Sequence, residues 1–266
     1  MILFHRLVYK YMELSNQITH FLELINKANK IVILTGAGIS TESGLPDFRS
    51  DDGFWTKNKP IFFRDFLNDK DARLLSWKRN YELKEKLAEI KPNSCHFFIT
   101  NLINKSQNNY LITQNIDGLH QVSGIDDKKI IEIHGNATKA SCLNCFKEFD
   151  PAIFHNAAIS NNEIPDCDAC GSIVKVSTIS FGQPMNEKDH TEAMFLAQSA
   201  DLFISIGTSL VVQPVASLPE LANKSGAKFV ILNREATPLD ALADLIINAE
   251  LKDIFAKISD DISIVH

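Results

Sequence analysis

Short apolar segments recur along the chain, and a polar cluster follows directly after each of them. The segments are rich in β-branched residues, as buried strands are, and helical patterns separate them. The polar clusters lie at 36–49, 114–120, 134–135, 207–209 and 233–235. In an open parallel sheet, ligands bind outside the carboxyl ends of the strands, where such clusters can converge on one crevice. The pattern predicts an α/β fold, a Rossmann-like parallel sheet with helices on both faces.

The expected strands and helices alternate over most of the chain. We expect strands at 31–34, 110–113, 130–133, 174–180, 202–206, 229–232 and 245–247, and helices at 13–29, 94–106, 187–200 and 251–258. Ser15 or Asn16 would cap the first helix. Residues 51–92 show no strand pattern, so they predict a helical insertion that can lie over the crevice.

The stretch after the first strand, Gly36 to Ser50, is longer than a simple turn requires. Gly36 and Gly38 allow a tight turn and a close approach of a ligand, and a strand followed by Gly-x-Gly and a helix start is typical of phosphate binding. An ordinary βα turn uses the same glycines, and the third position of the dinucleotide fingerprint is Thr41. Ser43 to Arg49 then breaks any helix early, which a plain dinucleotide-binding turn does not need.

Two Cys-x-x-Cys pairs, Cys142 with Cys145 and Cys167 with Cys170, account for all but one of the 5 cysteines. Each pair can place two thiolates one edge of a tetrahedron apart, and two pairs complete a four-sulfur zinc site. Such a zinc has no open position for water, so it would be structural and would hold a small module folded. Buried free cysteines are the alternative.

Three polar side chains at strand ends are candidates for catalysis. His134 precedes Gly135, which leaves space beside the imidazole for a substrate. Histidine is the usual general base near neutral pH, although a histidine at a strand end also serves structural roles. Asn115 and Asp117 share one loop and can orient an amide or a ribose hydroxyl, or simply make a turn. His120 is expected to pack or to cap a helix.

Composition and charge exclude some classes of protein. The hydrophobic fraction of 45% is ample for a core, and the net charge of -6 disfavours a dedicated nucleic-acid binder. Neither a membrane-spanning stretch nor a signal peptide is expected. Without a secretory signal, paired cysteines indicate a metal site rather than disulfides, and therefore a cytoplasmic, reducing compartment. Cys95 is expected to be a buried, inert thiol.

The order of these motifs resembles that of sirtuins, the NAD-dependent protein deacylases. The match covers residues 30 to about 250. It rests on GAGISTESGLPDFR (36–49), TQNIDGLH (113–120), IHG (133–135), the cysteine pairs, Phe181-Gly182, GTSL (207–210) and Asn233-x-Glu235. The resemblance implies NAD as co-substrate, one structural zinc in a small zinc ribbon, and acyl-lysine proteins or peptides as substrates.

The resemblance also implies a role for each part of the first loop. The Gly36-Ala37-Gly38 turn and Ser40 would hold the diphosphate and ribose of NAD. Residues 43–49, with Asp47 among the cofactor contacts, would form a mobile cofactor-binding loop. In that loop, Phe48 would shield the reacting sugar carbon from water, and Arg49 would lie near the phosphates.

The later motifs would complete the cofactor and substrate sites. Asp117 would bond the nicotinamide carboxamide in a pocket formed with Ile116, and Gln114 and Asn115 would contact the nicotinamide ribose and position water. The adenosine end would be held by Gly207, Thr208, Ser209, Asn233 and Glu235. The substrate peptide would lie as an added strand near Phe181, Gly182 and Val212.

The chemistry implied by the resemblance consumes NAD. The acyl-lysine oxygen attacks the ribose carbon as nicotinamide leaves, which gives an imidate linked to ADP-ribose. His134 then acts as base for a ribose hydroxyl that attacks the imidate carbon. The products are free lysine, nicotinamide and an O-acyl-ADP-ribose. A dry, shielded site would protect the cationic sugar carbon from premature hydrolysis.

Two departures from the family pattern bear on substrate choice. Gln183 follows Phe181-Gly182 where many sirtuins carry glutamate, which would alter the preference for basic residues beside the lysine. Sirtuins that prefer succinyl or malonyl groups carry Tyr-x-x-Arg in the helical insertion, and Trp77 and Asn80 align there, with Arg73 or Arg79 as displaced candidates. Without a guanidinium, a negatively charged acyl group lacks a bidentate partner, so an acetyl or another uncharged acyl group is expected.

Other functions on the same fold stay open from the sequence. A mono-ADP-ribosyltransferase, an NAD hydrolase and a non-catalytic NAD-binding sensor would use the same cofactor residues. A dehydrogenase is disfavoured by the extra loop after Gly38. It is also disfavoured because Glu235, the acidic residue expected at the adenosine ribose, comes late in the chain and not soon after the glycines. The expected division is a Rossmann-like NAD-binding domain (13–50, 93–137 and 176–266), a helical insertion (51–92) and a zinc-binding module (138–175). The oligomeric state is left open.

Overall fold

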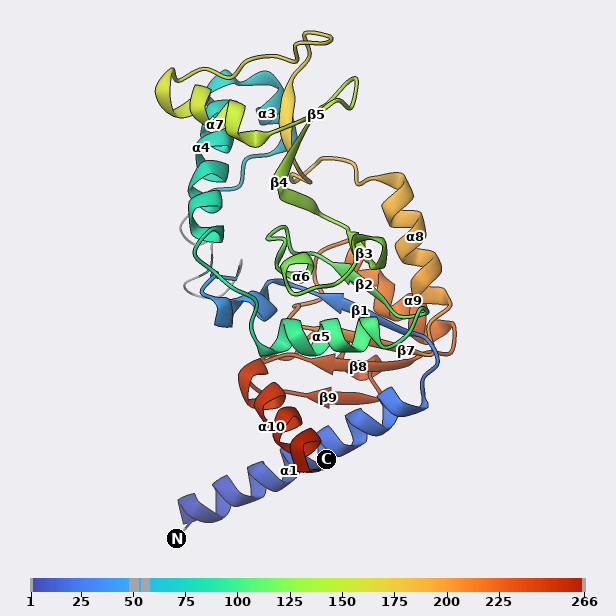
Figure 1. Ribbon diagram of the computed structural model, residues 1–266. Helices are drawn as coiled ribbons and strands as arrows, with labels where there is room; N and C mark the ends of the chain where they lie inside the picture. The colour runs from blue at the N-terminus through green and yellow to red at the C-terminus, as the bar shows by residue number, and fades with distance from the viewer. Residues whose placement is uncertain (1, 48–52, 54–57, 265–266) are drawn as a thin grey trace.

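The computed structural model describes residues 2–47, 53 and 58–264, and Figure 1 shows its arrangement. The larger sheet has the strand order β3-β2-β1-β7-β8-β9, and all its neighbouring strands are parallel. Its strands are β1 (Ile31–Thr35), β2 (Tyr110–Thr113), β3 (Ile130–Glu132), β7 (Leu202–Ile206), β8 (Lys228–Leu232) and β9 (Leu245–Ile247). The six strands expected in this sheet are confirmed within one residue at each end, whereas the strand expected at 174–180 belongs to a second sheet and ends at Thr178.

Helices cover both faces of this sheet, as an α/β fold requires (Figure 1). One face packs on α1 (Ile2–Lys27), α5 (Ser94–Asn104) and α10 (Leu251–Ile264), and the other on α8 (Glu187–Gln198) and α9 (Leu218–Lys224). A short helix, α6 (Leu119–Val122), follows β2, and 3₁₀ turns lie at Ala37–Ser43, Asp127–Lys129, Val215–Ser217 and Asp240–Leu242. Successive residues of β1, such as Ile33 and Leu34, are fully buried on opposite faces.

The first helix is longer than the sequence pattern predicts. It begins at Ile2 and runs through Ser15 and Asn16, so neither residue caps it, and that expectation is wrong. The segment before Ser15 contains no glycine or proline, so nothing in it breaks the helix. Its later turns pack Ile18 and Phe21 into the core below the sheet.

A second, smaller sheet lies beyond the β3 edge of the large one (Figure 1). It is antiparallel, in the order β5-β4-β6, and consists of β4 (Gly135–Cys142), β5 (Glu148–Phe149) and β6 (Val174–Thr178). Together with α3 (Phe63–Asn68), α4 (Lys70–Leu87) and α7 (Pro151–Ser160), it forms a part that we call the small module (Figure 1). Helices α3 and α4 both fall within 51–92, where the sequence predicts a helical insertion. Trp77 stacks on Phe154 at 4.8 Å in the core of this module.

A lysine is buried in the small module, and none of the described carboxylates pairs with it. Lys175 is 3% exposed, and its ammonium donates to the carbonyls of Val176 and Thr178 and lies over the Phe66 ring. Burial lowers the pKa of Lys175 to about 8. The unfolded chain would hold the same proton up to about pH 10.

We expect this difference in proton binding to make the effect of Lys175→Met on stability depend on pH. Between about pH 8 and 10 the unfolded state binds more protons than the folded state, so rising pH stabilises the wild type relative to the variant. The lowered pKa corresponds to roughly 3 kcal/mol over that interval, at about 1.4 kcal/mol per unit. Urea unfolding of both proteins from pH 7 to 10 measures the difference. If the difference in unfolding free energy between the two proteins did not change with pH, the lowered pKa of the buried Lys175 would be contradicted.

Candidate functional site

The turn after β1 brings two glycines against the turn after β7. Gly38 N–H donates to the Gly207 carbonyl at 2.9 Å, and a Cβ on Gly36 or Gly38 would lie 2.8 Å from that oxygen. Gly207 itself has φ +61, a conformation that favours glycine. β1 and β7 are neighbours, whereas β2 follows β1 on its other side, so the strand order reverses here. Ligands of doubly wound folds bind at such a point.

One cavity of about 580 Å³ opens at this edge of the sheet. The cofactor, catalytic and peptide residues expected from the sequence all line it, as far as the structure describes them. They are Gly36, Ala37, Gly38, Ser40, Asp47, Gln114, Asn115, Ile116, Asp117, His134, Phe181, Gly182, Gly207, Thr208, Ser209, Val212, Asn233 and Glu235. Phe48 and Arg49 lie outside the described residues. The volume is within the range of small-molecule sites.

A hydrogen-bonded network fixes the polar groups at the inner end of the cavity. The Ser40 hydroxyl donates to Asp117 at 2.8 Å and accepts from the Asn115 amide at 3.2 Å. Asp117 also accepts from the Leu119 N–H, but burial outweighs these bonds and raises the pKa of Asp117. The Asn115 Oδ1 atom is buried and meets no donor among the described residues.

An unpartnered acceptor of this kind is costly unless a ligand or water supplies the donor. The Asn115 side chain cannot turn to satisfy itself, because its amide nitrogen is already bonded to Ser40. The hydroxyls of a ribose are suitable donors. Together with the close contact of the turns after β1 and β7 that Gly36 and Gly38 allow, this acceptor fits the residues to a nucleotide cofactor.

His134 lies on the wall of the same cavity, between β3 and β4. Its Nδ1 atom is 3.2 Å from the Gln114 carbonyl, which can only accept, so the ring proton is on Nδ1. The lone pair that can take up a proton is therefore on Nε2. The backbone beside it is fixed as well, because the Ile179 N–H donates to the His134 carbonyl at 2.8 Å.

Gly135 permits this arrangement and should tolerate no side chain. It has φ +76, and a Cβ there would lie 1.8 Å from the Ser177 carbonyl oxygen. We expect Gly135→Ala to cost at least about 3 kcal/mol of folding free energy, from left-handed strain and from overpacking. Gly182→Ala is the matched control, since Gly182 has φ +78 with nothing within 4 Å, and it should cost only about 1–2 kcal/mol. Equal losses in urea unfolding would contradict the steric argument.

The outer end of the cavity carries the remaining expected cofactor residues. Gln114 donates to the Thr208 hydroxyl at 2.8 Å, which links the loops after β2 and β7. Asn233 donates to the Glu235 carbonyl at 2.7 Å, which shapes the turn after β8. The Glu235 carboxylate accepts from Arg234 at 3.0 Å. These loops present hydroxyl, amide and carboxylate groups, which suit a sugar.

An open strand edge leads into the cavity from the small module. β6 is an edge strand of its sheet, and Val176, Thr178 and Ile179 line the cavity. Past β6, the Phe181 carbonyl accepts from the Phe63 N–H at 2.9 Å, which joins this segment to α3. An edge strand offers unpaired backbone groups to an extended peptide.

Two reactive side chains lie outside the cavity, as expected. His120 is buried and its Nε2 atom lies 3.0 Å from the Thr35 hydroxyl, so it packs under the sheet edge. Burial lowers the pKa of His120 well below its usual range. Cys95 is buried in α5, and burial raises the pKa of its thiol, which keeps the thiol inert.

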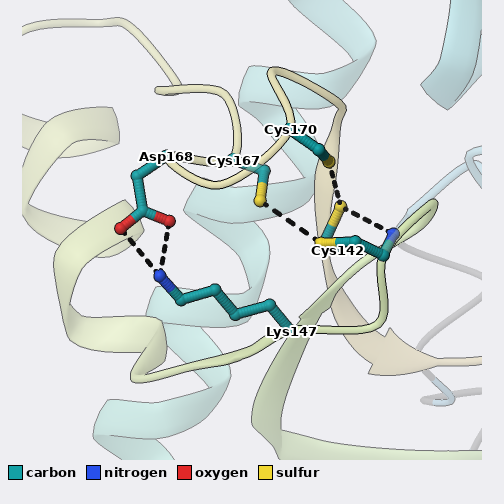
Figure 2. Close-up of polar contacts among 6 residues, drawn as sticks. Cys142, Lys147, Cys167, Asp168 and Cys170 are labelled. Carbon is teal, nitrogen blue, oxygen red and sulfur yellow. Dashed lines mark hydrogen bonds and ion pairs between the residues drawn. The ribbon is translucent and has the colours of Figure 1, made fainter.

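The four paired cysteines meet at one point of the small module (Figure 2). The Cys142 and Cys170 sulfurs are 3.5 Å apart, and those of Cys145 and Cys167 are 3.7 Å apart. A disulfide would need about 2.0 Å. Four sulfurs at about 2.3 Å from one zinc would be about 3.8 Å apart in a tetrahedron, so the donor set fits one structural zinc ion.

An ion pair links the two cysteine turns beside this cluster. Lys147 follows the first pair and lies 2.7 Å from the carboxylate of Asp168, which lies within the second (Figure 2). Both side chains are at least 44% exposed. An exposed pair of this kind contributes at most about 1 kcal/mol, so the metal rather than this pair must hold the turns together.

Helix α4 supplies a wall of the cavity that the sequence motifs did not identify. Ser76, Arg79, Asn80, Glu82, Leu83 and Lys86 line it. Trp77, which was expected at the acyl site, points into the small-module core instead, and that expectation is wrong. Ser76, Arg79, Leu83 and Lys86 recur at helical spacing of three or four on the cavity side of α4, and Trp77 lies outside that stripe because it packs against α7. Arg73 donates to the Phe66 and Leu67 carbonyls and also lies away from the cavity.

Comparison with known proteins gives consistent matches over nearly the whole chain. The Sir2 family model matches residues 36–214. An "NAD-dependent protein deacetylase" of Rhodopseudomonas palustris is 43% identical over 238 residues, which cover 90% of this chain and 94% of the relative. An "NAD-dependent protein deacylase 1" of Caldanaerobacter subterraneus is 42% identical, covering 84% of this chain and 90% of the relative.

Solved structures agree with these sequence relatives. A structure described as a Sir2–p53 peptide–NAD⁺ complex superposes with a TM-score of 0.79 at 34% identity, covering 92% of this chain and 98% of that one. A structure of Sir2Tm bound to a propionylated peptide gives a TM-score of 0.79 at 33% identity, covering 93% and 99%.

Proposed function

The chain belongs to the Sir2 family, and from its cavity we infer that it is an NAD-dependent protein-lysine deacylase. NAD is its co-substrate, and one zinc ion is structural. The observation that carries the inference is that one cavity contains the glycine turn, the Asn115–Asp117 loop and His134, and that the edge of β6 opens into it. An NAD hydrolase or a simple NAD sensor does not need a strand edge that can bind a peptide.

We propose the following roles for residues at the nicotinamide end. Asp117, held by Ser40, would bond the carboxamide, in a pocket formed with Ile116. The unpartnered Oδ1 of Asn115 would accept from a hydroxyl of the adjoining ribose. NAD, when bound, supplies the electrophilic sugar carbon and the leaving group. His134, with its proton on Nδ1, would take a ribose hydroxyl proton at Nε2 once nicotinamide has left.

The outer part of the cavity would bind the rest of NAD and the peptide. Support comes from the close contact of the turns after β1 and β7, which only glycines allow. The diphosphate would lie on the Gly36–Gly38 turn near Thr208, and the adenosine ribose near Asn233 and Glu235. The peptide would add to the edge of β6. The Rossmann-like domain would comprise 13–50, 93–137 and 176–266, and 51–92 and 138–175 would form the small domain.

The compartment is proposed from the cysteines. All 5 are free thiols in the structure, and a reducing, cytoplasmic environment keeps such thiols available for zinc. None of the described helices combines the length and apolar character needed to cross a membrane.

We propose that the acyl pocket favours uncharged groups. Arg79 on the cavity wall donates to the Lys59 carbonyl at 2.8 Å, and the carboxamide of Asn80 is bonded on both sides. Apolar side chains, Leu83 and Ile61 among them, also line the cavity. A succinyl or malonyl carboxylate would therefore lack a guanidinium directed at it.

The test is a panel of acyl-lysine peptides with NAD, read by mass spectrometry and nicotinamide release. We expect release to depend on the peptide, and acetyl and propionyl peptides to be at least about 10-fold better than succinyl or malonyl ones in kcat/KM, a difference of about 1.4 kcal/mol. Preference for the acidic acyl groups would contradict the pocket. Equally fast nicotinamide release without peptide would contradict the deacylase.

A further inference from the structure

Strand β4 leaves its sheet close to the cavity. Its pairing with β6 shifts between Gly135 and Ala140, so Ala137 is not held by the ladder. Ala137 is 3% exposed, and its buried backbone groups need partners elsewhere. Its N–H donates to the Ile116 carbonyl at 2.9 Å, and its carbonyl accepts from the Asn80 amide at 2.9 Å. One residue of β4 thus links helix α4 to the loop of Ile116 and Asp117.

The side chain of Asn80 is fixed in turn by a histidine of α7. The Asn80 Oδ1 atom lies 2.6 Å from His155 Nε2. Because the Asn80 amide nitrogen donates to Ala137, its Oδ1 must accept, so the proton of His155 is on Nε2. Helices α4 and α7 pack side by side, as Figure 1 also shows.

The environment of His155 holds the ring neutral and in one orientation. The ring is 2% exposed, and its Nδ1 atom is buried with no partner among the described residues. Burial, and then the charge of Lys84, lower the pKa of His155. The rings of Trp77 and Tyr81 meet the imidazole edge-on, with centroids 5.7 and 5.6 Å away.

We propose that His155 and Asn80 are positioning residues of the deacylation reaction, which set the nicotinamide pocket through the backbone of Ala137. The hydrogen bonds run without interruption from His155 Nε2–H to Asn80, from Asn80 to Ala137 and from Ala137 to Ile116. The part that carries the zinc therefore holds the loop that would bind nicotinamide. This inference rests on the proposed function for the roles of Ile116 and Asp117.

Loss of the pair should affect the nicotinamide end more than the adenosine end of the cavity. Asn80 and Ile116 both line the cavity, whereas the loops after β7 and β8 are fixed by other bonds, from Gln114 to Thr208 and from Asn233 to Glu235. A displacement of about 1 Å at a reacting group can cost about 100-fold in rate. ADP-ribose, which lacks nicotinamide, should bind unchanged.

The experiment compares His155→Gln with His155→Met in the full-length, zinc-loaded enzyme. Glutamine can place an amide donor near the position of Nε2 and should stay within about 3-fold of wild type. Methionine fills the space without a donor and should weaken nicotinamide inhibition and lower kcat at least about 10-fold, with the ADP-ribose Kd unchanged. Lys78→Met is the control, because it removes another contact of α4, the exposed 2.6 Å bond to Asn162 just after α7. It should behave as wild type.

Three results would overturn the proposal. A folded His155→Met enzyme with wild-type turnover and nicotinamide inhibition is one, and a glutamine variant as impaired as the methionine variant is another. The third needs no variant: ¹⁵N spectra of wild-type His155 should show the neutral Nε2–H tautomer at pH 7, and the Nδ1–H tautomer would contradict the chain of bonds. Absence of peptide-dependent turnover in the wild type would instead contradict the proposed function, and would leave the tautomer result standing.

Discussion

Replacing His134 with alanine is expected to lower kcat for acyl-peptide turnover by about 100- to 10,000-fold, the usual contribution of a general base. The hydrogen bond from Nδ1 to the Gln114 carbonyl presents Nε2 as the proton acceptor, and the variant removes both. The change is expected in kcat rather than in the KM for NAD. His134 is not among the groups that we propose to hold the nucleotide.

The same variant should separate the two halves of the reaction. The base is required only after nicotinamide has left. With acyl-peptide present, the variant should therefore exchange labelled nicotinamide into NAD at a rate within about 10-fold of the wild-type rate. Zinc content and thermal unfolding serve as folding controls. Equal loss of exchange and turnover in a folded variant would show that His134 acts before nicotinamide leaves, and would contradict its assignment as the late base.

Replacing Cys145 with alanine is expected to release the zinc and unfold the small module. Structural zinc sites contribute about 10–16 kcal/mol in small domains, so one thiolate of four accounts for about 3–4 kcal/mol, or about 100- to 1,000-fold in affinity. Cys142 and Cys167 form part of the module core. Loss of the metal would leave a core of few side chains, and the peptide edge of β6 would be lost with it.

Cys95→Ala is the matched control for this prediction. Cys95 is a buried thiol of α5 far from the cluster in sequence, so its removal creates a small cavity and takes no zinc ligand. We expect Cys95→Ala to bind one zinc per chain and to turn over at near the wild-type rate. At micromolar zinc, Cys145→Ala should retain less than about a tenth of the wild-type zinc content and turnover. Full zinc content in Cys145→Ala would contradict the four-thiolate site.

Much of the site could be predicted because its residues follow the ends of parallel strands. Strand ends meet at one edge of a sheet, so Gly36, Asn115, His134, Gly207 and Asn233 had to come together once the strands were recognised. The zinc ligands were predictable for a related reason. Two residues between paired cysteines fix the distance between their sulfurs locally, without help from the fold.

The features that escaped prediction depend on contacts between elements. Trp77 and Asn80 lie on one helix, and the packing of α4 on α7, which no local pattern encodes, decides which of them faces the cavity. The irregular pairing of β4 at Ala137 has no sequence signal either, and neither does the bond from His155 to Asn80. A buried histidine opposite an asparagine becomes recognisable only when the two helices are placed together.

The most direct test of the deacylase is a full account of its products from NAD and an acetyl-lysine peptide. Mass spectrometry of one reaction should find nicotinamide, deacetylated peptide and O-acetyl-ADP-ribose in equal amounts, with no product when NAD is omitted. Free acetate and ADP-ribose in place of O-acetyl-ADP-ribose, or nicotinamide formed without loss of the acetyl group, would contradict acyl transfer to the ribose.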